Sequence, residues 1–129
     1  MNYENILKVS VEFEEIEYGI LFGNDKVVFI KVGAGGELRG YQDKYLRMAH
    51  RIRGRIGATV ICATNPYIDG DAHLEADRNM INKVIAEGGL KNCEMYFVGT
   101  SDGGYHSLLL AKQFPKRQNT SASILRTAV

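Results

Sequence analysis

Residues 95–114 read MYFVGTSDGGYHSLLLAKQF, and this run predicts a buried strand, a tight turn and a helix. Met95–Val98 is apolar and short, as a strand buried on both faces is. The glycine-rich turn 99–104 follows, and the helical run Tyr105–Phe114 ends before Pro115. A strand that passes directly into a helix in this way is typical of a parallel α/β sheet.

The rest of the chain continues the same alternation of strands and helices. Residues 9–13 alternate between apolar and polar, and residues 16–22 form a second strand-like run, so we expect an antiparallel hairpin at one edge of the sheet. The remaining runs predict strands at 26–32 and 58–63 and helices at 41–52 and 74–85. The predicted fold class is α/β, with a mostly parallel twisted sheet and helices on both faces. Residues 1–129 are expected to form a single domain.

The turn after residue 98 has the spacing that a nucleophilic serine requires. Gly99-Thr100-Ser101-Asp102-Gly103 fits the pattern G-x-S-x-G, in which the serine sits on a strained turn with its hydroxyl above the sheet. The chain passes so close to itself there that positions 99 and 103 accept only small residues, and both are glycine in this sequence. The alternative is an ordinary strand-to-helix turn in which Ser101 caps the helix.

A second glycine-rich loop, Gly33-Ala34-Gly35-Gly36, follows the strand predicted at 26–32. Its backbone N–H groups could stabilise the negative charge that develops on an acyl oxygen. Both glycine-rich loops come after strands, and ligands bind beyond the carboxyl ends of parallel strands. The alternative is a flexible connection to the next helix.

Together, the element order and the two loops resemble the α/β-hydrolase superfamily over about residues 6 to 116. The resemblance implies acyl transfer from a small-molecule ester or acyl substrate through an acyl-serine intermediate, without a metal or cofactor. It implies Ser101 as the nucleophile, with the N–H groups of Asp102 and Ala34 as oxyanion donors. It also implies that Gly99 and Gly103 shape the tight turn around Ser101, which we call the elbow, and that Gly33 and Gly35 shape the glycine loop.

Members of that superfamily carry a catalytic acid and then a histidine after the serine. Residues 116–129 contain no histidine, aspartate or glutamate. We therefore expect a hydrolase-like N-terminal half at 1–116 with an atypical tail at 117–129, truncated after the elbow helix and inactive or weakly active alone. The alternative is a non-catalytic binding or interaction module on the same scaffold.

Three histidines remain as internal candidates for a base. His106 lies on the elbow helix, which runs away from Ser101, and His50 lies in a basic helix and is expected at the surface. His73 is the best placed of the three, and Asp69, Asp71 and Asp77 near it even suggest a metal site. The plainer interpretation is an acidic loop and helix start, and we expect no metal.

Other features bear on partners and location. A hydrolase half without its later strands leaves strand 95–98 at an edge, which either a substitute strand from the tail or the edge of another chain would cover. We expect a homo-oligomer, a dimer or larger, formed through the exposed sheet edge. The net charge is +1, and the arginines of the basic helix are expected to form a solvated face, so neither nucleic acid nor a membrane is an expected partner. We expect Cys62 and Cys93 to be buried free thiols. The first residues show no signal peptide, which favours the cytoplasm.

Overall fold

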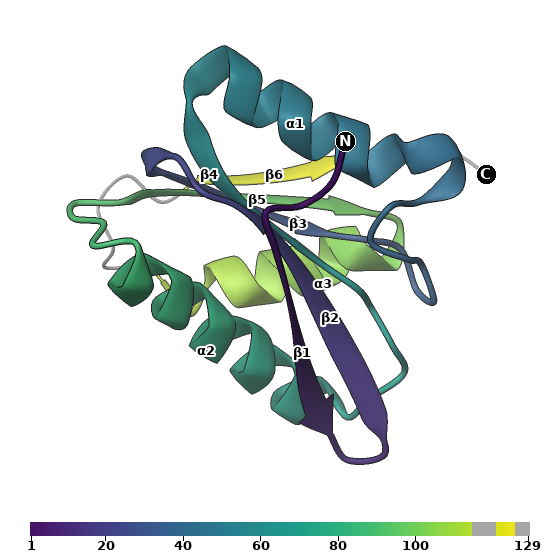
Figure 1. The fold of residues 1–129 in the computed structure, drawn as a ribbon. Coiled ribbons are helices and arrows are strands. Elements are labelled where there is room, and N and C mark those ends of the chain that lie inside the picture. Colours follow the sequence, from purple (N-terminus) through teal and green to yellow (C-terminus); the bar gives the residue numbers. More distant parts are fainter. Residues whose placement is uncertain (115–120, 126–129) are drawn as a thin grey trace.

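A six-stranded mixed sheet separates two layers of helices in the computed structural model, which describes residues 1–114 and 121–125 (Figure 1). The strands lie in the order β1-β2-β4-β3-β5-β6. β1 pairs antiparallel with β2 and β2 antiparallel with β4, whereas β4, β3, β5 and β6 run parallel. Their bounds are β1 Asn5–Val11, β2 Glu14–Leu21, β3 Asn24–Lys31, β4 Ala58–Ala63, β5 Glu94–Thr100 and β6 Ser121–Leu125.

The helices cover the two faces of the sheet. The short 3-10 turn η1 (Tyr41–Asp43) leads into α1 (Lys44–Ile56), which covers one face, while α2 (Gly70–Glu87) and α3 (Asp102–Ala111) cover the other (Figure 1). Because successive strand side chains point to opposite faces, β3 sends Val28 and Ile30 toward α1 and sends Val27 and Phe29 toward α2 and α3. The predicted α/β sheet with helices on both faces is confirmed.

Both edges of the sheet bear on the predictions. The hairpin of β1 and β2 forms one edge, as predicted. At the other edge β6, from the tail, pairs with β5 in parallel, with Phe97 opposite Ala122. Of the two expected outcomes at this edge, the substitute strand is therefore present. The rest of the predicted tail, at 117–120 and 126–129, lies outside the described residues.

Some predicted details are wrong. Phe13 lies in the hairpin turn, fully exposed, because β1 ends at Val11. The helix predicted at 41–52 is α1, which passes through Gly54 and continues to Ile56. Gly57 ends it, because Gly57 takes the left-handed φ of 70° and donates its N–H to the Arg53 carbonyl. Tyr41 precedes this helix and is 81% exposed instead of facing the core.

Two other observations concern the chain as a whole. Cys62 and Cys93 are buried free thiols, as predicted. Within the described ranges, none of the helices combines the length and the apolar character needed to cross a bilayer.

Candidate functional site

The backbone at Ser101 is strained. Ser101 joins β5 to α3 with φ 54° and ψ −123°, a region that residues with a side chain rarely occupy. Its side chain makes no capping hydrogen bond to α3, so the alternative of an ordinary helix-capping serine is wrong. The residue is exposed at the carboxyl end of β5. The sequence pattern thus predicted the right turn, and the surrounding structure must hold it in place.

The flanking glycines show why the turn needs small residues. A Cβ added at Gly99 would overlap the carbonyl group of Gly103. A Cβ added at Gly103 would overlap the carbonyl of Lys31 and lie 2.6 Å from the carbonyl oxygen of Val32. The turn is therefore packed against the end of β3, where the glycine loop 33–36 begins.

That loop is ordered by hydrogen bonds rather than being a free connection. The Gly35 N–H donates to the Asn65 carbonyl at 2.9 Å, and the Gly36 N–H donates to the Gly33 carbonyl at 2.9 Å. The Tyr45 hydroxyl accepts from the Gly33 N–H at 3.3 Å. Within residues 1–114 and 121–125, the N–H groups of Ala34 and Asp102 have no acceptor. Both are thus available to a ligand.

The residues that carry these two amides line the same pocket as two histidines. This pocket of about 250 Å³ is lined by Ala34, Asp102, His73 and His106 among others, and we call it the histidine pocket. Its remaining lining comes from the loop after β4, the start of α2 and α3: Asn65, Pro66, Tyr67, Ile68, Gly70, Leu74, Tyr105 and Leu109. A second pocket of about 480 Å³ lies on the glycine loop and is lined by Tyr41, Lys44 and Tyr45 among others. Ala34 lines both pockets.

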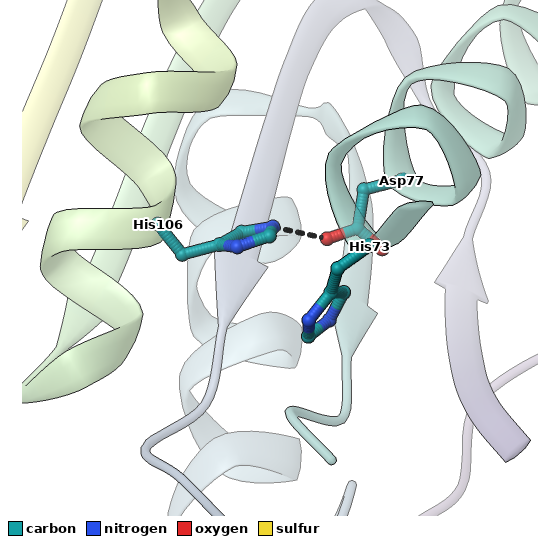
Figure 2. A group of neighbouring side chains, drawn as sticks. All are labelled: His73, Asp77 and His106. Carbon is teal, nitrogen blue, oxygen red and sulfur yellow. Dashed lines mark hydrogen bonds and ion pairs between the residues drawn. The ribbon is translucent and has the colours of Figure 1, made fainter. Parts of the chain in front are cut away.

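A buried polar cluster lies next to the histidine pocket. Lys31, the last residue of β3, is fully buried, and its ammonium donates to Asp77 Oδ2 at 2.8 Å, His73 Nε2 at 2.7 Å and the Thr64 carbonyl at 2.7 Å. Asp77 also accepts from His106 Nε2 at 2.7 Å and from the Tyr18 hydroxyl at 2.5 Å. Figure 2 shows His106 reaching from α3 to Asp77 and His73, which both lie on α2. We call Lys31, Tyr18, His73, Asp77 and His106 the Lys31 cluster.

The charges in this cluster stabilise one another. Burial alone would raise the pKa of Asp77, but the Lys31 charge and the His106 hydrogen bond outweigh it and hold this pKa at about 2. Burial lowers the pKa of Lys31, an effect that the Asp77 charge opposes. Burial and the nearby Lys31 charge lower the pKa of His73 to about 4, so this imidazole is neutral at neutral pH. The buried lysine and aspartate thus form an ion pair whose hydrogen-bonding groups all have partners.

The same residues include a set of atoms that could hold a metal ion. Ligand atoms of His73, Asp77 and His106 lie within 4.8 Å of one another, and two imidazoles with one carboxylate suit several transition metals. The Lys31 ammonium, however, donates to His73 and Asp77 and so takes the place that a cation would need. The expectation of a plain acidic loop and helix start is wrong for His73 and Asp77, which are buried. Asp69 caps α2, and Asp71 is exposed.

No protein-family model and no curated protein matches this sequence. Solved structures do match the fold. A thermostable carboxyl esterase from Bacillus coagulans superposes with a TM-score of 0.71 at 12% identity, covering 96% of this chain and 44% of the esterase. The chain has the α/β-hydrolase fold. Est1E from Butyrivibrio proteoclasticus superposes with a TM-score of 0.65 at 12% identity, covering 88% of this chain and 47% of that protein.

An α/β serine hydrolase homologue from Coxiella burnetii is also similar, with a TM-score of 0.61 at 11% identity, and here 98% of this chain covers 74% of the homologue. The chain spans about half the length of the two esterases. At these identities the likeness concerns the fold.

Within this α/β-hydrolase fold the predicted site residues come together in part. Ala34 and Asp102 share one pocket, and Ser101 directly precedes Asp102. The histidines are held elsewhere: among the described residues, His50 bonds to the Asn2 carbonyl, His73 to Lys31 and His106 to Asp77, and none bonds to Ser101.

Lys31 is the residue that the sequence analysis missed. The signal was a lysine directly after the apolar run Val27–Ile30 in the strand predicted at 26–32, because a charge buried beside such a run requires a partner.

Proposed function

We propose that the chain is a serine-hydrolase-type domain in which Ser101 accepts an acyl group from a small-molecule ester or other acyl substrate. The observation that carries this proposal is the backbone of Ser101, with φ 54° and ψ −123° on an exposed turn between β5 and α3. Strain of this kind persists only where the surroundings impose it, and here Gly99 and Gly103 have no space for a Cβ. The α/β-hydrolase fold supports the same proposal.

The neighbouring groups suit the chemistry of acyl transfer. The substrate carbonyl oxygen would accept hydrogen bonds from the free N–H groups of Ala34 and Asp102 as it gains negative charge. The N-terminus of α3 favours the same charge. The Ser101 Oγ attacks the carbonyl carbon, the alcohol leaves with a proton, and water then releases the acid from the acyl-serine.

The rate of these steps depends on a base for the Ser101 proton. In the described part of the chain no histidine is hydrogen-bonded to Ser101, so its hydroxyl keeps its ordinary weak nucleophilicity. Amide donors and a binding pocket alone leave only a small part of the catalysis of a full triad. We therefore propose that this chain alone hydrolyses esters weakly or not at all.

A fluorophosphonate probe followed by mass spectrometry tests the role of Ser101. The expected result is a slow adduct on Ser101 that is absent from Ser101→Ala. Added imidazole should accelerate p-nitrophenyl acetate hydrolysis more with the wild type than with Ser101→Ala, because it supplies the missing base.

Two results would decide otherwise. Equal reactivity of the wild type and Ser101→Ala in both assays would refute the nucleophile and favour a non-catalytic binding module. Rapid labelling of Ser101 without imidazole would keep the nucleophile and refute the weak activity.

A further inference from the structure

The Lys31 cluster fixes the proton positions on two neighbouring imidazoles. His73 Nε2 is 2.7 Å from the Lys31 ammonium, which has only N–H groups to offer, so His73 Nε2 accepts and its proton lies on Nδ1. His106 Nε2 is 2.7 Å from Asp77 Oδ2, an ionised carboxylate that can only accept, so His106 Nε2 carries a proton. In the neutral His106 ring, Nδ1 is then an acceptor.

Each of the two rings has one nitrogen left, its Nδ1 atom. Neither Nδ1 atom has a hydrogen-bond partner among the described residues. Among the described residues, every buried side-chain nitrogen and oxygen has a hydrogen-bond partner. Since the two Nδ1 atoms have none, they are not buried, and solvent reaches both. Both rings line the histidine pocket, and their centroids are 4.4 Å apart. The two neighbouring rings that line this pocket therefore carry one solvent-accessible donor and one solvent-accessible acceptor.

We infer that the histidine pocket binds a small neutral ligand through a polar group that both donates and accepts a hydrogen bond, such as a carboxamide or a hydroxyl. His73 Nδ1–H donates to this group and His106 Nδ1 accepts from it. The Lys31 charge is matched by Asp77, so with a neutral His106 ring the two imidazoles offer no net charge to attract a carboxylate. A ketone satisfies only the His73 donor and leaves the His106 acceptor without a partner.

The other walls of the pocket define the rest of the ligand. Pro66, Ile68, Leu74 and Leu109 are apolar, and a volume of about 250 Å³ limits the ligand to a small molecule. Tyr67 and Tyr105 line the same pocket and are 81% and 65% exposed. Exposed aromatic rings of this kind can cover a flat apolar body by stacking. A small aromatic amide or alcohol therefore matches both parts of the pocket.

The first test measures the proton positions. Long-range ¹H–¹⁵N spectra of the histidine side chains at pH 7.5 should show the Nδ1–H tautomer for His73 and the Nε2–H tautomer for His106. The opposite tautomer at either residue, or a charged His106, would overturn the inference.

The second test measures binding with matched probes. Benzamide should shift the His73 and His106 signals in a saturable way. It should bind about ten-fold more tightly than acetophenone, which lacks the N–H donor, and than benzoate, which carries a negative charge. Three results would each refute the inference. Benzamide could bind no more tightly than acetophenone, benzoate could bind most tightly of the three, or no saturable shift could occur.

Control variants separate this inference from the proposed function, on which it does not rest. Ser101→Ala should bind benzamide as the wild type does, because Ser101 is not among the residues that line the pocket. His106→Leu should lose the preference for benzamide over acetophenone. His50→Gln, on α1 at the opposite face of the sheet, should keep it. If His106→Leu does not fold, the comparison of benzamide with acetophenone on the wild type still decides.

Discussion

Lys31 places a positive charge inside the layer between the sheet and α2. An ion moved from water into such surroundings costs several kcal/mol unless it is paired and hydrogen-bonded. All three ammonium protons of Lys31 have acceptors, and one of these is the charged Asp77. The fold therefore tolerates this ion pair because both charges are present and hydrogen-bonded. Removal of either partner leaves an uncompensated charge in the core.

A double-mutant cycle tests this dependence. Lys31→Met and Asp77→Leu should each lower the free energy of unfolding by about 3–5 kcal/mol, because each leaves a buried charge unpaired. The double variant should be less destabilised than the sum of the two by about 1–3 kcal/mol. Urea denaturation of the four proteins measures the cycle. Additive losses would mean that the two charges are not coupled.

The pKa of His73 gives the fold a defined acid sensitivity. The unfolded chain protonates His73 below about pH 6.5, but the fold keeps it neutral down to about pH 4. The folded pKa is thus depressed, and its stabilising effect is complete above pH 6.5 and is lost as the pH falls from 6.5 to 4. Because solvent on the pocket side weakens the effect, the free energy of unfolding should fall by roughly 2 kcal/mol between pH 6.5 and pH 4.

The variant His73→Gln isolates this effect. Its amide oxygen can still accept from Lys31 but cannot titrate in this range. Denaturation at pH 7 and pH 4.5 should show a smaller loss for His73→Gln than for the wild type. Asp77 adds a separate loss only below about pH 3.8, because its folded pKa is about 2. Equal losses in the two proteins above pH 4.5 would contradict the role of His73.

The glycines differ in importance according to the element that holds them. Gly103→Ala should destabilise the fold by more than about 2 kcal/mol, because the new Cβ meets backbone carbonyls of β3 that cannot move aside easily. Gly54→Ala is the matched control: it lies inside α1, has nothing within 4 Å of its Cβ position, and should stabilise by about 0.5–1 kcal/mol. Thermal unfolding compares the two. A Gly103→Ala protein as stable as the wild type would mean that the elbow is not packed as described.

Local sequence patterns predicted the elements well because strands and helices are marked by short-range periodicity. The elbow was equally visible, since Gly99 and Gly103 are required by contacts within the turn and with β3. The Lys31 cluster was not, because it joins β2, β3, α2 and α3 through packing that no local pattern reports. Only the i, i+4 spacing of His73 and Asp77 was visible, as one helix face.

At the scale of the whole molecule, β6 changes what the sheet exposes. Without it, the apolar β5 would have unpaired backbone groups along one side. With it, the outer strands are β1 and β6, and β6 has only five residues. The expected homo-oligomer stays a prediction, now through one of these outer strands. Light scattering measures it: a dimer or larger assembly is expected, and a monodisperse monomer would contradict it.

A chain shortened after Phe114 tests the contribution of β6 directly. Its removal leaves the outer side of β5 without the pairing that Tyr96–Thr100 make with β6. Unpaired strand edges bind other edges, so the shortened chain should form larger assemblies than the full chain at the same concentration. A lysine placed in β5 of the shortened chain tests whether this strand forms the contact between chains. Phe97 is unsuitable for this change, because it is fully buried and a charge there would disturb the core. Val98→Lys is the better choice, since this side chain is only partly buried, and a charge there should reverse the association. Equal assembly sizes for the full and shortened chains would show that β6 does not protect this edge.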